Sequence, residues 1–335
     1  MAVHQHPDLV RFSFRLSRCN TSRLWSALGL ALSLPYRIGR YDYVVKLTET
    51  MIMATHTKVA SPRNYGAPAG IRLVAAIESV GFPLFNAVQA ANEAATLGLT
   101  KGHTNMLLHE LAAGGWITRV KKGLYAVNDP LTRSPKAHPF SIGAAIVERA
   151  AISHWSAFQH WGLTEQIPST VMLSSPTRTF PPAAEDHAAS GRPGWTVAGV
   201  RYEFVSVPPP RFFGVTEVWL DEQSRVPVFE RERALLDAFY HFHIFGSLSV
   251  GMEILEAHLS DIDVDRLVDY AVRFGVAAIV KRLGWVLDHL GTPRDVLQPL
   301  LAYPAKGNSP LDPGLPARGR HDATWHVIEN LTRDR

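Results

Sequence analysis

The side chains whose types and spacing best suit chemistry lie between Thr100 and Lys122. On a helical wheel, the leucines of residues 101–113 define a core direction and turn Asn105 and its neighbours outward. An exposed Asn can form two hydrogen bonds with adenine in the major groove, whereas cationic side chains and a helix N-terminus bind phosphate. The pattern therefore predicts a DNA-binding surface. Its expected residues are Thr100, Lys101, Gly102, Asn105, Met106, His109, Arg119, Lys121 and Lys122.

Three helices and a hairpin must position these side chains. Apolar residues at helical spacing predict the helices, Thr100 is the expected N-cap of the third, and Gly123 can adopt the positive φ that a tight hairpin turn needs. The expected segments are helices at 70–80, 84–97 and 101–113 and strands at 116–120 and 124–127. This order of elements predicts a winged helix-turn-helix DNA-binding domain over residues 61–130.

Positive charge is concentrated in the first half of the chain. The protein has 335 residues and a net charge of +4. Residues 1–150 hold 17 basic and 8 acidic side chains, whereas residues 151–335 hold 17 and 22. The basic first half favours a polyanionic partner. Residues 1–60 show no sustained hydrophobic period, so we expect a flexible extension there, with translation beginning at Met1, Met51 or Met53.

The second half has the pattern of a separate α+β domain. Residues 131–139 resemble a loop, after which short β-rich runs are followed by helical periodicity. The expected strands are 171–173, 195–197, 202–207 and 215–220, and the expected helices are 230–239, 250–259 and 265–290. The sequence thus predicts an α+β fold, with the winged domain followed by a mixed α+β domain over residues 140–331.

Membrane insertion is excluded by length, because the most apolar stretch, residues 24–34, is shorter than the about 20 residues that span a bilayer. The chain has one cysteine, Cys19, so it has no intramolecular disulfide. We therefore expect a protein of the reducing cytoplasm that does not associate with membranes.

Catalytic and metal-binding patterns are absent from the sequence. His241 and His243 would face different directions on a helix, and His154 and His160 are about 240° apart on one. Asp237 lies in a run of alternating charges that favours salt bridges and helix capping. No phosphate-binding loop, nucleophile elbow or His-Glu-x-x-His motif occurs. The sequence predicts neither an enzyme nor a cofactor or metal site.

Several short motifs together resemble the AbiEi family of antitoxins, over roughly residues 70–331. They are Trp116-Ile117, Lys122-Gly123-Leu124-Tyr125, Ser156-Ala157, residues 162–168, residues 232–237, Lys281-Arg282-Leu283-Gly284, Leu287, Leu290-Gly291, Leu311-Asp312-Pro313, Trp325 and Asn330. The resemblance implies a winged domain that binds operator DNA, with inverted repeats as the expected site, and represses its own operon. It also implies a C-terminal domain that counters a nucleotidyltransferase toxin, directly or indirectly, and a role in phage defence. The extension lies outside the family pattern.

Two alternatives remain open at the level of sequence. Asn105 and His109 are also compatible with an ordinary solvated helix face in a winged module that contacts proteins. A winged-helix regulator whose C-terminal domain senses a small ligand, or serves as a protein-interaction scaffold, would share the same elements.

Overall fold

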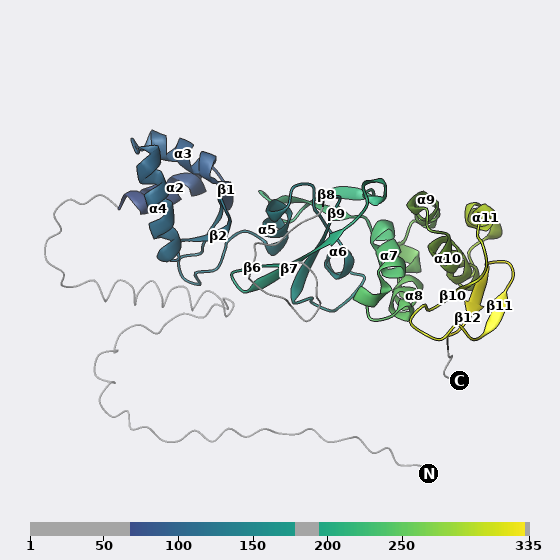
Figure 1. Ribbon diagram of the computed structural model, residues 1–335. Helices are drawn as coiled ribbons and strands as arrows, with labels where there is room; N and C mark the ends of the chain where they lie inside the picture. The colour runs from purple at the N-terminus through teal and green to yellow at the C-terminus, as the bar shows by residue number, and fades with distance from the viewer. Residues whose placement is uncertain (1–67, 178–193, 332–335) are drawn as a thin grey trace, which may run out of the picture. The chain divides into compact units, whose positions relative to one another are not determined.

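The computed structural model describes residues 68–177 and 194–331 (Figure 1). These residues belong to one compact unit, Gly66–Arg335, which contains two hydrophobic cores. Helices and strands occur largely in separate runs along it, and the fold is α+β, as predicted. The expected extension at 1–60, with Cys19, Met51 and Met53, lies outside the described residues. None of the helices in the described ranges has the length and apolar character needed to cross a membrane.

The first core belongs to a module of three helices and three strands, shown in blue in Figure 1. In chain order they are α2 (Ala69–Ser79), β1 (Leu84–Asn86), α3 (Ala87–Thr96), α4 (Lys101–Ala113), β2 (Ile117–Lys121) and β3 (Leu124–Val127). The strands pair antiparallel in the order β1-β3-β2. Three helices with a small antiparallel sheet made of β1 and the β2–β3 hairpin have the arrangement of a winged helix-turn-helix. We call residues 69–127 the winged module.

The second helix begins later than the sequence predicted. Residues Leu84–Asn86 form a strand in register with β3, in which Phe85 lies opposite Tyr125. The Asn86 side chain accepts hydrogen bonds from two backbone N–H groups in the first turn of α3, and the Gln89 side chain accepts one from the N–H of Asn86. This capping box starts the helix after Asn86, and pairing with β3 overrides the helical pattern before it.

The second core includes residues of a mixed six-stranded sheet. Its strands are β4 (Ala151–Ile152), β5 (Thr170–Ser175), β6 (Gly194–Val197), β7 (Val200–Ser206), β8 (Val215–Trp219) and β9 (Arg225–Phe229), and two helices accompany them, α5 (Pro139–Ile146) and α6 (His154–Trp161). The sheet order is β6-β7-β5-β4-β9-β8, with β5/β7 and β4/β9 parallel. Strands β4 and β9 are not expected from the sequence, because β4 is two residues long and Pro227 within β9 disfavours a strand.

Five helices and a small sheet complete the fold. They are α7 (Arg231–Tyr240), α8 (Leu248–Ala257), α9 (Val264–Phe274), α10 (Ala277–His289) and α11 (Arg294–Ala302), followed by β10 (Ser309–Pro310), β11 (Arg320–Asp322) and β12 (Val327–Glu329). The helical pattern expected over 265–290 is divided between α9 and α10. Gly275 ends α9 with a φ of 75°, and a new helix begins at Ala277.

The winged module also contributes to the second core. Val120 and Ala126 of the β2–β3 hairpin are buried there, whereas Ile117 and Val127 of the same hairpin are buried in the first core. Because neighbouring residues of a strand point to opposite faces, one hairpin serves both cores.

Candidate functional site

Helix α4 presents its expected recognition residues on one exposed face. Thr100 caps the helix, because its Oγ1 accepts a hydrogen bond of 3.4 Å from the backbone N–H of His103. The buried face consists of Thr104, Leu107, Leu108 and Leu111. The exposed face holds Lys101, Gly102, Asn105, Met106 and His109. A β-carbon added at Gly102 would meet no atom of residues 68–177 or 194–331 within 4 Å, so in this part of the chain the backbone at the helix start is open to close approach.

The hairpin separates the three basic residues expected on it. Arg119 and Lys122 are exposed, and Gly123 turns the chain with a φ of 78°. Lys121 is half-buried, and its ammonium donates a hydrogen bond of 2.8 Å to the backbone carbonyl of Ile146 in α5. The Lys121 side chain therefore connects the hairpin to α5. Its ammonium points toward α5, whereas the Arg119 and Lys122 side chains are exposed to solvent.

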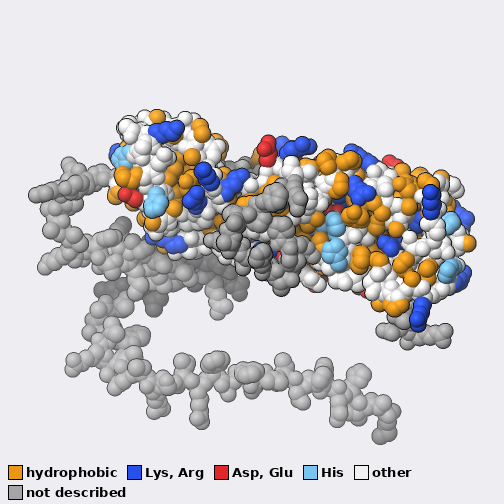
Figure 2. All heavy atoms as spheres, viewed as in Figure 1, with side chains coloured by type: hydrophobic (Ala, Val, Ile, Leu, Met, Phe, Trp, Pro, Cys, Tyr) orange, Lys and Arg blue, Asp and Glu red, His pale blue; other side chains and the backbone are white. Residues whose placement is uncertain are grey.

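Charge on this surface is predominantly positive. From residue 100 to residue 127, Glu110 is the one acidic residue, against four basic ones. In Figure 2 the visible face of the winged module carries several Lys, Arg and His side chains and a small acidic area among apolar and uncharged ones. The arrangement suits a ligand with a regular array of negative charges, and the Asn105 amide adds a group that can read a hydrogen-bonding edge.

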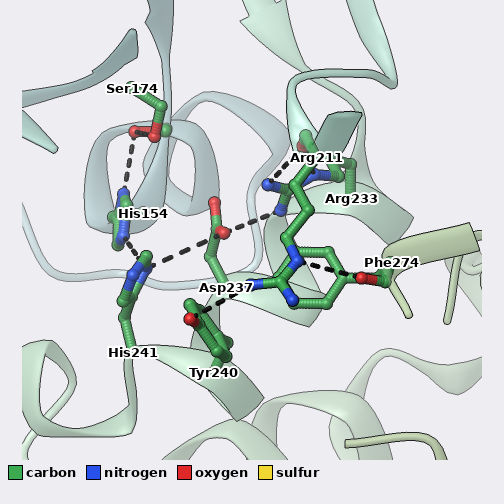
Figure 3. Close-up of polar contacts among 9 residues, drawn as sticks. His154, Ser174, Arg211, Arg233, Asp237, Tyr240, His241 and Phe274 are labelled. Carbon is green, nitrogen blue, oxygen red and sulfur yellow. Dashed lines mark hydrogen bonds and ion pairs between the residues drawn. The ribbon is translucent and has the colours of Figure 1, made fainter. Parts of the chain in front are cut away.

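A second cluster of chemically capable side chains lies within the second core (Figure 3). His154 is the first residue of α6, Asp237 lies in the last turn of α7, and His241 follows the end of α7. His154 Nε2 lies 3.0 Å from His241 Nδ1, which in turn lies 3.9 Å from Asp237 Oδ1. His154 and Asp237 are fully buried, whereas the His241 side chain is 16% exposed. We call these three residues the histidine cluster.

Two serines extend the histidine cluster on one side. Ser153 Oγ lies 2.8 Å from His154 Nδ1, and Ser174 Oγ of β5 donates a hydrogen bond of 3.0 Å to Ser153 Oγ. Both ring nitrogens of His154 are therefore engaged, one by a hydroxyl and one by the second imidazole. The backbone of His154 has a φ of 52°, a region that residues with a side chain rarely adopt.

Arg233 extends the histidine cluster on the other side. Its guanidinium is fully buried and donates a hydrogen bond of 2.7 Å to Asp237 Oδ1, and it also donates to the backbone carbonyl of Arg211. Burial acts to raise the pKa of Asp237, but Arg233 and the two histidines together hold that pKa below its usual value. The salt bridge expected of Asp237 is thus present, as a buried pair.

Sequence spacing alone could not bring the histidine cluster together. His241 follows Asp237 by four residues, which places the two on one helix face, and this spacing is the one local signal. His154 lies 87 residues before His241, so its approach depends on how α6 packs against α7. The neighbours considered from the sequence lie elsewhere: His160 packs on Trp161 at 4.7 Å between ring centroids, and His243 is exposed.

A cavity of about 530 Å³ lies between α8, α10 and the small C-terminal sheet. Its walls combine apolar side chains with several charged ones. They are Met252, Glu256, Trp285, Val286, His289, Leu290, Leu311, Arg320, Asp322, Glu329 and Leu331. This volume is within the range of small-molecule sites.

Comparison with known proteins relates this chain to others by fold. No protein-family model matches it, and no curated protein does. Its fold is similar to the crystal structure of the RV2827C protein from Mycobacterium tuberculosis, with a TM-score of 0.54 and 15% sequence identity, covering 80% of this chain and 92% of that one. At this level of identity the similarity shows a common fold and nothing about activity.

Proposed function

We propose that this protein is a DNA-binding antitoxin of the AbiEi type, which represses its own operon and counters a nucleotidyltransferase toxin. It would act in the cytoplasm as a binding protein and not as an enzyme. The observation that carries the proposal is the exposed face of α4, where Lys101, Asn105 and His109 lie on a winged module whose hairpin exposes Arg119 and Lys122.

Each exposed group has a defined role in this proposal. The free N–H groups at the start of α4 and the Lys101 ammonium bind a phosphate, and Gly102 lets the DNA backbone approach the helix. Asn105 forms two hydrogen bonds with an adenine, and Met106 and His109 contact neighbouring bases. Arg119 and Lys122 bind phosphates beside the groove. Lys121 stays on Ile146 and takes no part in DNA contact.

The C-terminal motifs that resemble the antitoxin family have structural roles in this chain. Gly284 lies against the Trp325 indole, and the backbone N–H of Asp312 donates to Asn330 Oδ1, while Asn330 Nδ2 donates back to the Asp312 carbonyl. Residues with such packing roles are expected to be shared by proteins with a common scaffold. They support assignment to the family's fold, while the toxin-facing surface would lie elsewhere on this domain.

DNA binding is tested with the full-length protein and the DNA upstream of its own reading frame, against unrelated DNA of the same length. If each protomer neutralises about five phosphates, log K should fall with log salt at a slope of about −4.5. Arg119→Ala and Lys122→Ala should weaken binding to both DNAs. Lys306→Ala removes one exposed charge from the loop after α11 and is the matched control. Equal affinity for both DNAs, with no salt dependence, would contradict the proposal.

Neutralisation is tested by expressing the adjacent reading frame in cells with and without this protein and scoring growth. The proposal predicts toxicity from the neighbour and its relief by the full-length chain. A double variant, Arg119→Ala with Lys122→Ala, should lose repression of the operon but keep neutralisation, because both residues lie on the winged module. A neighbour without toxicity would reject the antitoxin role and leave the DNA-binding role standing.

One observation favours a second candidate function, a regulator that senses a small ligand. The cavity of about 530 Å³ beside α10 is large enough for a metabolite, and its Arg320 and Glu329 could contact polar groups of one. Under this alternative, added ligand should change operator affinity, and a metabolic operon should accompany the reading frame.

A further inference from the structure

We propose that His154, Asp237 and His241 form a binding site for one divalent transition-metal ion of the Zn²⁺ class. Two imidazoles and a carboxylate are the ligand set that such ions prefer. The candidate ligand atoms all lie within 4.8 Å of one another. The site goes beyond the proposed function, because neither DNA binding nor toxin neutralisation requires it.

The spacing of the two imidazole nitrogens already suits a shared ion. Zinc binds histidine nitrogen at about 2.0–2.1 Å, so two nitrogens of a tetrahedral site lie roughly 3.3 Å apart. His154 Nε2 and His241 Nδ1 lie 3.0 Å apart. An ion placed between them requires only a small widening of this separation, and a similar adjustment would bring the Asp237 carboxylate into range.

The surroundings of His154 favour a lone pair at Nε2. When its Nδ1–H donates to Ser153 Oγ, at 2.8 Å, Nε2 is unprotonated and can bind a metal. Ser174 in turn donates to Ser153, which holds that hydroxyl oxygen in place. Metal-binding histidines generally donate their second ring N–H to an oxygen in this way, and the partner fixes the orientation of the ring.

The Asp237 carboxylate has one oxygen held and one oxygen available. Arg233 donates to Oδ1, whereas Oδ2 is buried and accepts no hydrogen bond from any described residue. A buried carboxylate oxygen without a partner is costly, and a bound cation would satisfy it. The Arg233 guanidinium has interactions besides its salt bridge with Asp237, because it also lies over three phenyl rings. These rings belong to Phe213, Phe229 and Phe274.

The histidine cluster joins two helices and reaches the surface. His154 begins α6, and Asp237 and His241 lie at the end of α7, so a shared ion would tie these helix ends together. The His241 side chain is 16% exposed and offers the route by which an ion could enter. Figure 2 shows histidine side chains at the surface in the region of these two helices.

Cobalt(II) titration of the full-length protein, first freed of metal with a chelator, tests the site. We expect one Co²⁺ per chain, with the visible absorption of a low-coordinate nitrogen and oxygen site, and its displacement by Zn²⁺. Added Zn²⁺ should also raise the melting temperature, because binding to the folded state alone stabilises it. His241→Ala should weaken binding at least tenfold, and Ser153→Ala about 10- to 100-fold through loss of orientation.

His243→Ala is the matched control, because His243 is an exposed histidine two residues from His241. The His243→Ala variant should bind Co²⁺ with the same affinity as the unaltered protein. Circular dichroism checks that each variant is folded. If the His241→Ala variant does not fold, the imidazole ¹⁵N resonances of the unaltered protein are measured instead. Zn²⁺ should then shift the resonances of two histidines, Nε2 of one and Nδ1 of the other. Absence of stoichiometric binding, equal binding by the His241 variant, or shifts at other histidines would overturn the proposal.

Discussion

A β-carbon added at Gly284 of α10 would lie 2.0 Å from Cζ3 of Trp325, a distance at which two carbon atoms cannot coexist. The indole has little freedom to withdraw, since it is 1% exposed and its Nε1 donates a hydrogen bond of 2.8 Å to Asp288. The close approach of α10 to the C-terminal sheet therefore depends on a glycine at this position.

The first prediction is that Gly284→Ala destabilises the protein by about 1–3 kcal/mol, through overpacking against Trp325. Urea unfolding of the full-length chain measures the loss. Gly102→Ala is the matched control, because it also adds one methyl group within a helix but meets no atom of the described residues within 4 Å. The control should leave stability unchanged or raise it by up to about 1 kcal/mol. Equal behaviour of the two variants would contradict the packing argument.

The second prediction separates two adjacent lysines. Lys122→Ala should weaken binding to every DNA sequence and reduce the salt slope by about one, because it removes a phosphate contact. Lys121→Ala should leave the salt slope unchanged and lower stability by about 1 kcal/mol, because it removes a hydrogen bond to Ile146. Salt titrations and urea unfolding of both variants provide the comparison. A reduced salt slope for the Lys121 variant would show that Lys121 contacts DNA phosphate.

The third prediction concerns base recognition. Asn105→Ala should lose about 1–3 kcal/mol of binding free energy to the operator and relax specificity at one base pair, because its amide is placed to read an adenine. Affinity for a set of operators with single substitutions measures this. A uniform loss across the whole set would assign Asn105 to general contacts.

The fourth prediction concerns the buried pair of Arg233 and Asp237. The pKa of Asp237 is lower in the folded chain than in the unfolded chain, so the unfolded state binds more protons as the pH falls. The stability that this carboxylate contributes is present above the unfolded pKa, about 3.9, and is lost as the pH falls through the folded value. Unfolding measured from neutral to acidic pH should show this loss.

Asp237→Asn is the variant that isolates the effect. It should cost about 3–5 kcal/mol at neutral pH, because it leaves the Arg233 charge buried and unpaired. The difference between the two proteins should shrink in acid, where the carboxyl of the unaltered chain is also neutral. A difference that stays constant through the acidic range would show that the charge of Asp237 contributes little.

Much of the winged module could be predicted because its signals are local. Thr100 caps α4, the leucines of that helix are buried, and Gly123 turns the hairpin with a positive φ, as their types and spacing indicated. The exposed positions of Asn105 and His109 follow from the same helical period. Within one helix, the spacing of residues along the chain fixes which face each residue occupies, so the sequence alone predicts their arrangement.

Other features depended on partners distant in the chain. Leu84–Asn86 forms a strand because it pairs with β3. The Lys121 side chain was expected to contact phosphate, but it donates a hydrogen bond to the Ile146 carbonyl because α5 packs near the hairpin.

By itself the sequence determined the α+β class, the Thr100 cap, the charged hairpin and the exposed face of α4, because each arises from neighbours within a few residues. Only the tertiary structure decided that His154 lies beside His241 and Asp237, that Asp237 Oδ2 is buried with no hydrogen-bond partner among the described residues, and that the Trp325 indole packs against Gly284. The physical reason is that these contacts join segments whose approach is set by packing of the whole core, and no local period encodes that packing.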